Sequence, residues 1–451
     1  MPADIPFAAV RELAESAYGS VEELYRYLHA HPELSFREEN TARRLAQELQ
    51  ESGFDVIPGV GGHGVVGVLR NGLGGTVLVR TDMDGLPVEE RTGLPYRSRV
   101  RLMDDFGNEV SVMHACGHDL HMAVFIGAGR LLARLKECWG GTLVFVAQPA
   151  EERSEGAKAM ISDGLFDRFP RPDCCLALHV SPSLPAGVIG WSEGYSWASV
   201  DMLDITIPGV GGHGAYPHMT RDPIVTAAQA VLAFQTIISR DVDPNEPAVL
   251  TVGAIQGGST YNVIPEEVRI KVTVRSYAAA VRDNILRRVE QILAHLSGAA
   301  DLPADRQPLV TVTHSQPAVY NDPALTRRLV QVFSQAFGGD RVVMLKPEMG
   351  GEDFGFFGMV EPRIPICIFR LGAVDPGLIA QGRSSHQTPP SLHSSTFAPL
   401  PTPTITTGVE AMTLAVLDCL RGAYPATRKL QAGRSGRPKD SPKTTGECQE
   451  N

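Results

Sequence analysis

Four short apolar runs set the strongest constraint on how this chain can fold. They occupy residues 64–69, 76–81, 142–148 and 175–180. Largely apolar runs of this length are typical of strands buried on both faces of a parallel sheet. The stretch 118–136 carries its apolar residues at helical spacing, as a crossover helix would. The sequence therefore predicts a doubly wound, mostly parallel α/β layer.

Polar side chains stand at the ends of these predicted strands. Asp82 follows one run, Glu151 and Glu152 follow the next, and His179 lies near the end of the last. In open α/β sheets, ligands bind beyond the carboxyl ends of the strands. We therefore expect these residues, distant in sequence, to meet in one crevice.

The pattern changes between residues 190 and 316. Strands are predicted from alternation and helices from 3.6-residue spacing, in the order strand 203–207, helix 223–239, strands 248–255 and 268–274, helix 281–296 and strand 309–312. This β-α-β-β-α-β order is that of a ferredoxin-like unit, with one antiparallel sheet and both helices on one face. We expect an inserted α+β domain that acts as a lid or a dimerisation domain.

The length of the chain also favours more than one domain. A chain of 451 residues exceeds what one hydrophobic core usually serves. We assign residues 1–189 and 317–423 to the two parts of a catalytic domain, and residues 190–316 to the insert. Residues 424–451 are rich in Lys, Arg, Ser, Pro and Gly, a composition typical of a disordered tail.

The charge balance narrows the possible partners. The net charge is −10 and Lys and Arg form no stripe, which argues against nucleic acid or an anionic membrane as partner. The first nine residues lack the basic and apolar regions of a signal peptide, and no run is long enough to span a membrane. We expect a cytoplasmic protein that acts on a small molecule. Its seven scattered cysteines are expected to be reduced.

Residues 114–119, with the sequence HACGHD, place a thiol and two imidazoles within a few positions. Cys116 and His118 are two residues apart, a spacing suited to an extended segment or a loop rather than to one helix face. Thiolate, imidazole and carboxylate ligands together suit zinc, cobalt, nickel or manganese better than magnesium or calcium. The alternative is that His114, His118 and His121 cap a helix while Cys116 is a small buried residue.

The adjacent carboxylates Glu151 and Glu152 also indicate a metal site. Two carboxylates at the end of a strand repel each other unless a cation neutralises one of them. Beside Cys116 and His118, we interpret the pair as a division of labour, in which one residue binds metal and the other moves protons. The alternative is a solvated pair in a loop.

Taken together, these segments resemble the aminoacylase and carboxypeptidase superfamily of co-catalytic metallohydrolases. The resemblance is to the amidohydrolase branch of hippurate hydrolases, auxin-conjugate hydrolases and bacterial N-acyl-amino-acid deacylases, and it covers residues 21–420. Its markers are LHAHPELSFREENTA (28–42), RTDMDGLPVEE (80–90), MHACGHDLHMA (113–123), QPAEERSEGAKAMI (148–161), HV (179–180), GVGGHGAYPH (209–218), NVIPE (262–266), GGEDF (350–354) and LH (392–393).

The resemblance implies a two-metal site. Its ligands to two divalent ions per subunit would be Cys116, His118, Glu152, His179 and His393. Manganese or zinc is expected first, then cobalt or nickel. Glu151 would be the general base, and Asp84 would orient a ligating imidazole. The wider superfamily has a histidine where this chain has Asp82. We therefore do not expect Asp82 to ligate a metal directly, and we expect Cys116 to compensate for the change.

The resemblance also assigns roles to the insert. His213 would stabilise the oxyanion of the tetrahedral intermediate, and Asn262 and Arg275 would contact the carbonyl or carboxylate of the substrate. Read without the resemblance, His213 is a turn residue and Arg275 a surface charge at a strand end. Because His213 and the metal ligands fall in different domains, closure of the insert over the substrate is expected. In relatives the smaller domain also forms a dimer, and in some the partner subunit supplies the histidine.

The function implied is hydrolysis of the amide bond of an N-acyl or N-aroyl amino acid, giving a carboxylic acid and an amino acid. A metallo-dipeptidase or carboxypeptidase is a close alternative, because it uses the same metals on a peptide bond. A non-catalytic binding protein of the same fold is less expected, since Glu151, Glu152, Cys116 and His118 are all present. A homodimer or higher homo-oligomer is expected.

Overall fold

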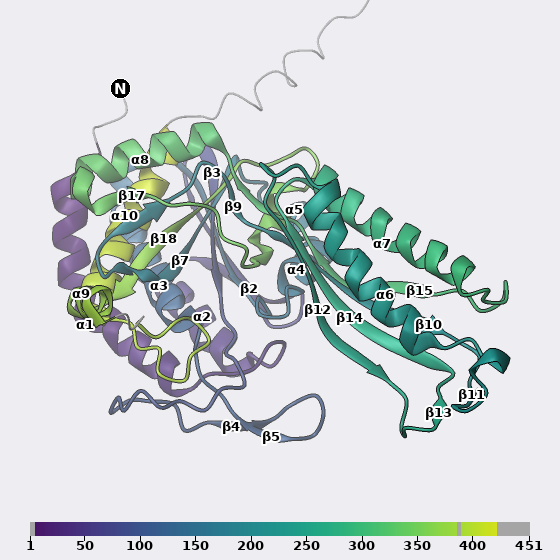
Figure 1. The fold of residues 1–451 in the computed structure, drawn as a ribbon. Coiled ribbons are helices and arrows are strands. Elements are labelled where there is room, and N and C mark those ends of the chain that lie inside the picture. The colour runs from purple at the N-terminus through teal and green to yellow at the C-terminus, as the bar shows by residue number, and fades with distance from the viewer. Residues whose placement is uncertain (1–4, 386–388, 422–451) are drawn as a thin grey trace, which may run out of the picture.

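The larger of two domains is built on an eight-stranded sheet, seen in the computed structural model, which describes residues 5–385 and 389–421 (Figure 1). Parallel pairing joins β6 to β3, β3 to β7, β7 to β18 and β17 to β8. The predicted mostly parallel layer is therefore confirmed. The order across the sheet is β1 (Asp55–Val60), β2 (Gly64–Asn71), β6 (Gly141–Gln148), β3 (Gly75–Asp82), β7 (Cys174–Pro185), β18 (Ile366–Val374), β8 (Ile189–Trp191) and β17 (Val342–Met344).

One predicted strand direction is wrong. The run 64–69 falls in β2, which pairs antiparallel with both β1 and β6. The connection from β2 to β3 is only residues 72–74 and reverses the chain, so β3 runs opposite to β2. Strand β6 lies between them and is parallel to β3. It must therefore be antiparallel to β2.

Alternate residues of the large sheet feed two separate cores. On β6, Leu143 and Phe145 belong to one buried cluster, whereas Val144 and Val146 belong to another. This two-sided burial explains why the strands are apolar throughout. The first cluster packs against α1 (Phe7–Ala30), α2 (Glu39–Glu51), α3 (His118–Arg134), α8 (Pro323–Phe337) and α10 (Pro401–Arg421), and the second against α4 (Gly156–Ser162), α5 (Leu165–Arg168) and η5 (Asp353–Gly358). A further helix, α9 (Pro376–Ser385), follows β18.

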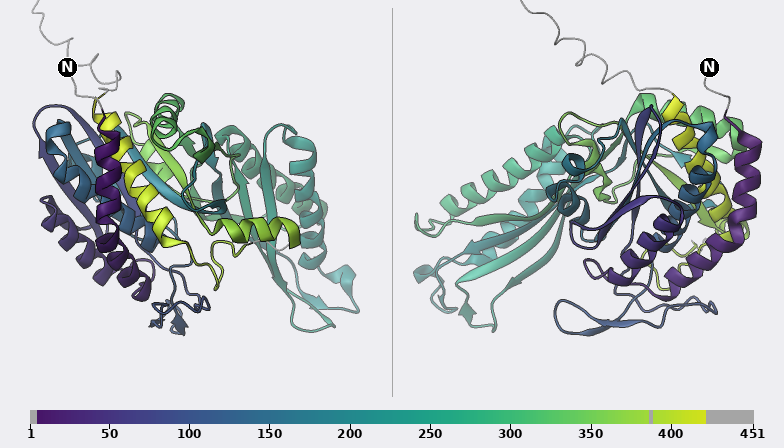
Figure 2. Two further views of the ribbon diagram at one scale, coloured as in Figure 1. Left: turned by 90° about the vertical axis from the view of Figure 1, so that its left-hand side faces the viewer. Right: turned by 180° about the vertical axis from the view of Figure 1, so that it is seen from behind.

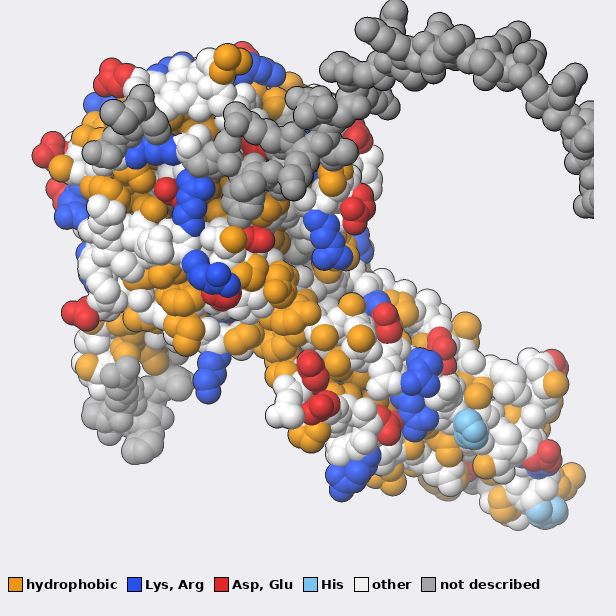
Figure 3. All heavy atoms as spheres, turned by 90° about the horizontal axis from the view of Figure 1, so that it is seen from above, with side chains coloured by type: hydrophobic (Ala, Val, Ile, Leu, Met, Phe, Trp, Pro, Cys, Tyr) orange, Lys and Arg blue, Asp and Glu red, His pale blue; other side chains and the backbone are white. Residues whose placement is uncertain are grey.

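The insert has the predicted β-α-β-β-α-β order and forms an arm that projects from the main domain (Figures 2 and 3). Its antiparallel sheet has the order β12-β14-β10-β15. The two helices share one core with the sheet, through Phe234 of α6 and Ile285 and Val289 of α7. The elements are β10 (Ser199–Pro208), α6 (Pro223–Thr236), β12 (Ala248–Gly257), β14 (Glu267–Ser276), α7 (Ala279–Ala299) and β15 (Leu309–Gln316).

Three short strand pairs complete the described fold. Strands β9 (Gly194–Trp197) and β16 (Val319–Asn321) pair beside the two connections to the insert. Strands β11 (Gly212–His213) and β13 (Val263–Ile264) pair at the end of the insert remote from the large sheet (Figure 1). Strands β4 (Arg101–Met103) and β5 (Glu109–Ser111) form a hairpin.

Two further observations concern the chain as a whole. Among the described residues, no helix has the length and apolar character needed to cross a membrane. The tail predicted at residues 424–451 lies outside the part of the chain that the structure describes. The domain boundaries given above stand as our proposal.

Candidate metal centre

Cys116 lies in the loop before α3 and His118 is the first residue of that helix, with Gly117 between them packed against Val180 of β7. Between them, Gly117 adopts φ 81° and caps the helix. A Cβ at this position would lie 2.6 Å from Cγ2 of Val180. Both the left-handed backbone and the close approach therefore require glycine, and this turn lets the two side chains share one site.

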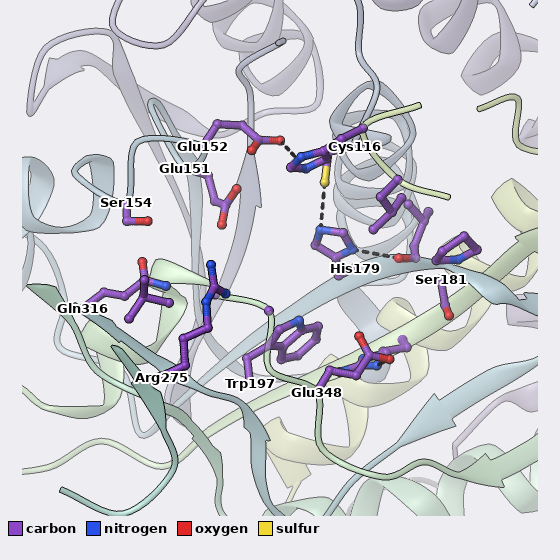
Figure 4. Close-up of a pocket in the computed structure, with 18 of the residues that line it drawn as sticks. Cys116, Glu151, Glu152, Ser154, His179, Ser181, Trp197, Arg275, Gln316 and Glu348 are labelled. Atoms are coloured by element: carbon purple, nitrogen blue, oxygen red, sulfur yellow. Dashed lines mark hydrogen bonds and ion pairs between the residues drawn. The ribbon is translucent and has the colours of Figure 1, made fainter. Parts of the chain in front are cut away.

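The five predicted ligands come together in two groups that share Cys116. Ligand atoms of Cys116, His118 and His179 lie within 4.8 Å of one another, as do those of Cys116, Glu152 and His393. Cys116 Sγ is 3.6 Å from His179 Nε2, and His393 Nε2 is 3.4 Å from Glu152 Oε1. Figure 4 shows Cys116, His179 and Glu152 converging on one wall of a pocket.

Hydrogen bonds hold both buried imidazoles in the form that a metal needs. His118 donates from Nδ1 to the carbonyl of Asp84 at 2.8 Å, and His179 donates from Nδ1 to the carbonyl of Val180 at 2.7 Å. Each Nε2 is thereby left as an acceptor facing the site. Among the residues that the structure describes, His118 Nε2 and Glu152 Oε1 have no hydrogen-bond partner although both are buried. Such orphaned atoms are rare in proteins, and a cation would satisfy both.

The electrostatic field at this point also favours positive charge. Burial by itself would lower the pKa of His118, but Asp82 and Asp84 outweigh it and raise that pKa to about 10. Burial, together with the charges of Glu152 and Glu151, raises the pKa of the Cys116 thiol. A bound cation would reverse this second effect and hold Cys116 as a thiolate. The residues present thus fit divalent metal ions.

Asp82 is fully engaged with other partners. One oxygen lies 2.7 Å from Nδ1 of His121, and the other accepts from Arg80 at 2.8 Å. His121 in turn accepts the N–H of Val180 at its Nε2, so its Nδ1 carries the proton donated to Asp82. The ligand atoms of Asp82, His118 and His121 also lie within 4.8 Å of one another, but these contacts already engage Asp82 and both ring nitrogens of His121. We keep Asp82 outside the proposed ligand set.

Two buried carboxylates clamp the strand-end loop that carries the glutamate pair. The N–H of Ala150 donates to Glu38 at 2.8 Å. The next two N–H groups, of Glu151 and Glu152, donate to the two oxygens of Asp84, each at 3.1 Å. Ala150 adopts φ 51°, a conformation that costs energy for a residue with a side chain and is typical of functional sites. Asp84 therefore fixes both the glutamate pair and, through its carbonyl, His118.

Glu151 faces the pocket from a strongly acidic surrounding. Burial raises its pKa well above the ordinary value, and the charges of Glu352 and Glu152 add to this effect. Beneath it, the buried Arg80 forms ion pairs with Glu352 and Asp353 at 3.1 and 3.0 Å. A carboxylate whose pKa is raised in this way is suited to accept and return a proton.

The pocket is a cavity of about 330 Å³ shared by the two domains. Cys116, Glu151, Glu152 and His179 line it on one side, and Trp197, Arg275, Gln316 and Glu348 line it on the other. His393 also lines it. Arg275, on β14 of the insert, points into it in Figure 4 and donates to the carbonyl of Met349 at 2.6 Å. Gly350 and Gly351 also line the pocket.

Comparisons with known proteins identify the family. A model described as peptidase family M20/M25/M40 matches residues 78–393. The chain belongs to this family. An N-acetyl-L-cysteine deacetylase of Bacillus subtilis (strain 168) is 37% identical over 333 residues, which cover 74% of this chain and 76% of that protein. A hippurate hydrolase of Campylobacter jejuni is 36% identical over 341 residues, which cover 75% and 85%.

A solved structure agrees. The YXEP protein of Bacillus subtilis, described as a dinuclear metal binding peptidase from the M20 family, superposes with a TM-score of 0.72 at 26% identity, covering 90% of this chain and 99% of that one. The predicted resemblance is thus confirmed, and the chain is an M20 hydrolase with a candidate metal centre.

Two predicted residues of this M20 hydrolase lie elsewhere. His213 and Asn262 are exposed and lie side by side at the end of the insert, where β11 pairs with β13 and Gly214 donates to the carbonyl of Asn262 at 2.8 Å. His213 accepts the N–H of Ala215 and stays within its own loop. Neither residue lines the pocket. Arg275, by contrast, is brought to the pocket by the same insert.

The sequence reasoning did not find several residues that support the site. Arg80 lies inside an otherwise apolar run. Because a charge in a buried strand must be paired, this residue could have indicated the presence of buried acidic partners, which are Glu352 and Asp353. Glu38 had no such signal, because its contact with Ala150 joins residues 112 positions apart.

Proposed function

We propose that this chain is a metal-dependent amidohydrolase that removes the acyl or aroyl group from N-acyl amino acids. One observation carries the proposal: five potential ligands meet around Cys116 beside Glu151, in a pocket that also holds the guanidinium of Arg275. The deacetylase and hippurate hydrolase relatives, as their names describe them, support an N-acyl amino acid as the substrate class.

Two divalent ions, manganese or zinc, are the proposed cofactors. Their ligands would be Cys116, His118, Glu152, His179 and His393. When bound, such ions supply Lewis acidity that polarises an amide carbonyl and makes a water more acidic. The chain itself contributes the fixed positions of the ligands, through the hydrogen bonds of His118 to Asp84 and of His179 to Val180.

Glu151 is the proposed general base and acid. Its carboxylate lies on the pocket wall next to the ligand Glu152, and the clamp from Asp84 fixes its backbone. It would take a proton from the attacking water and deliver it to the amide nitrogen as the carbon–nitrogen bond breaks. The acidic surrounding of Glu352 and Glu152 gives it the affinity for the proton that this transfer needs.

Arg275 is the proposed anchor for the carboxylate of the amino acid. Its guanidinium can donate two parallel hydrogen bonds to a carboxylate, and its position opposite Glu151 would place the scissile amide between them. His213 and Asn262 are proposed to reach a pocket from the end of the insert, His213 toward the oxyanion and Asn262 toward the substrate carbonyl. Because they lie far from the pocket of their own chain, we propose that a second copy in a homodimer supplies them.

The test is an assay of metal-loaded protein with N-acetyl and N-benzoyl amino acids and, as a control, the matching amides that lack the free carboxylate. The proposal expects metal-dependent release of the amino acid from the N-acyl amino acids. Activity on the matching amides should be lower by about ten-fold or more, because Arg275 then lacks a carboxylate to bind. Absence of release from every acylated amino acid would refute it. A dipeptidase or carboxypeptidase uses the same catalysts, and cleavage restricted to peptides would favour that alternative.

A further inference from the structure

A second cavity lies at the junction of the two domains, apart from the metal centre. Its volume is about 670 Å³, larger than the 330 Å³ of the pocket beside Cys116. The chain passes between the domains at residue 198, between β9 and β10, and at residues 317–318, between β15 and β16. The second of these connections lines the cavity, which we call the hinge cavity, together with Tyr277 of the insert and Tyr320 of the main domain. A molecule bound here would therefore contact both domains.

Aromatic rings from three elements line the hinge cavity. Tyr195 of β9 stacks on Tyr277, with ring centroids 5.5 Å apart, and meets Tyr320 of β16 edge to face at 5.0 Å. Phe356 of η5 also lines the cavity. Tyr277 is buried, but 49% of Tyr320 is exposed. Part of this aromatic surface is thus open to a flat ring, which would pack against it in a stacked or edge-to-face arrangement.

The hinge cavity also has a cation in its lining that is open to a ligand. Arg363 is exposed, and among the described residues it forms no ion pair or hydrogen bond. The other arginine of the lining, Arg282, is neutralised by Asp201, whose two oxygens accept from it at 2.7 and 2.6 Å. Asp322 lines the cavity as well, but its carboxylate caps α8 and accepts the N–H of Leu325. The charge available to a ligand is therefore positive.

We propose that the hinge cavity is a regulatory site for a planar aromatic carboxylate. Its rings pack against Tyr195 and Tyr320, and its carboxylate pairs with Arg363. The volume lies within the range of about 300–1,000 Å³ that is usual for small-molecule sites. Among the described residues, Gln316 alone lines both this cavity and the pocket of the metal centre. The site is therefore separate from the proposed hydrolysis, and its existence does not depend on that reaction.

A ligand at the hinge acts on the metal centre through the orientation of the insert. Arg275 reaches the metal-site pocket from β14, and Tyr277 of the hinge cavity follows two residues later. On the other side, η5 contributes Phe356 to the hinge cavity and begins at Asp353, the partner of the buried Arg80. A ligand favours the conformation to which it binds. It would hold the orientation seen here and oppose the closure of the insert over the substrate.

Calorimetric titration of the metal-loaded protein with 2-naphthoate and 2-naphthamide tests the site. The two probes have the same rings and differ in charge. We expect 2-naphthoate to bind about ten-fold or more tightly than 2-naphthamide, the effect of a charge-assisted hydrogen bond. Equal affinities of the two probes, or no binding of either, would overturn the proposal.

Variants distinguish the hinge cavity from the metal-site pocket, where Arg275 also offers a cation. Arg363→Gln should weaken the binding of 2-naphthoate by about ten-fold and change that of 2-naphthamide by less than about three-fold. Arg275→Gln should retain the charge-dependent binding. The matched control is Arg134→Gln, which removes an exposed arginine on α3 outside both cavities. Loss of 2-naphthoate binding in Arg275→Gln but not in Arg363→Gln would place the ligand at the metal centre and overturn the proposal.

A kinetic measurement tests the regulation. With metal-loaded protein and a saturating N-acetyl amino acid, saturating 2-naphthoate should lower kcat by about two-fold or more. In Arg363→Gln the same concentration should have little effect. An unchanged kcat, or a change confined to KM, would overturn the regulatory role. This outcome is distinct from failure of the proposed function, in which no N-acyl amino acid is cleaved while 2-naphthoate still binds as expected.

Discussion

The metal-ligand cluster and the end of the insert carry histidines in opposite physical settings. At the cluster, His118 is fully buried, one ring nitrogen is bonded to Asp84, and the other is left without a partner. At the end of the insert, His213 is exposed, its Nδ1 accepts from Ala215 in its own loop, and its backbone pairs with Val263 of β13. The first region gathers its candidate ligands within one chain. The second lies away from the pocket of its own chain.

The difference separates a cluster whose side chains are fixed within one chain from a region whose proposed roles depend on motion or on a second chain. Packing and hydrogen bonds from α3, β3, β6 and β7 fix the cluster, so its geometry costs no reorganisation when substrate binds. The proposed roles of His213 and Asn262 require the end of the insert to move or to meet a second chain. Changes in the cluster should therefore act within one subunit, and changes at the end of the insert should act between subunits.

The largest expected effect is that of Glu151→Gln. Loss of the group that moves the proton should lower kcat by about 10³-fold. Since Glu151 is not among the proposed ligands, the metal content measured by atomic emission should stay at the level of the unaltered protein. Retained activity would remove Glu151 from the mechanism, and loss of metal would make it a ligand instead.

His213→Ala should have the next largest effect, about 10²-fold on kcat, the magnitude typical of one oxyanion donor. If the partner supplies His213, mixing this variant with Glu151→Gln should restore activity, because a mixed dimer contains one complete site. An equal mixture after subunit exchange should reach about a quarter of the activity of the unaltered protein. Absence of restoration, with dimers shown to exchange, would place His213 in its own subunit or outside the reaction.

Glu38 tests whether the hydrogen bonds around the metal-ligand cluster hold Glu151 in position. Glu38→Ala removes the acceptor of the Ala150 N–H, and the left-handed turn before Glu151 should relax. We expect kcat to fall by about ten-fold with little change in KM, because binding groups such as Arg275 are untouched. Glu38→Gln keeps an acceptor and should recover most of the loss. Glu39→Ala, on the exposed side of the same helix, is the control and should have no effect.

The last prediction concerns stability and pH rather than catalysis. His29 lies between Asp119 and Glu90, at 2.6 and 3.1 Å. Burial alone would lower the pKa of His29, but these two carboxylates raise it to about 9. Because the folded pKa exceeds the unfolded value, the stabilisation of about 3 kcal/mol is complete below about pH 6.5 and is lost as pH rises through about 9.

Urea unfolding of the unaltered protein and of His29→Gln between pH 6 and 10 checks this prediction. The difference in unfolding free energy between them should shrink as pH rises. A difference that grows or stays constant with pH would contradict it.

Much of this fold could be predicted from sequence, because hydrophobic periodicity reports local structure. The ferredoxin-like order of the insert, the strand that ends at Asp82 and the strand just before Glu151 follow from such patterns. The predicted strand end at His179 is wrong, because β7 continues past it to Pro185. The direction of β2 could not be predicted in this way. It depends on the insertion of β6 between β2 and β3, which is set by contacts between residues far apart in the sequence.

The residues of the site also divide into those that could be predicted from the sequence and those that could not. Cys116, His118 and Glu152 were predictable because metal chemistry limits the residue types and because the motifs resemble a known family. The distance of His213 and Asn262 from the pocket was not, since it depends on how far the insert projects. Neither was the position of Glu348 in the pocket lining, which depends on long-range contacts that include its β-bridge to Trp197.

The account depends most on two metal ions sharing Cys116, and anomalous X-ray diffraction from crystals grown with manganese or zinc tests this directly. We expect two peaks, both within about 2.0–2.5 Å of ligand atoms, one beside His118 and His179 and the other beside Glu152 and His393, with Cys116 Sγ adjacent to both. A peak held instead by Asp82 and His121, a single peak remote from Cys116, or no peak at saturating metal would contradict the account.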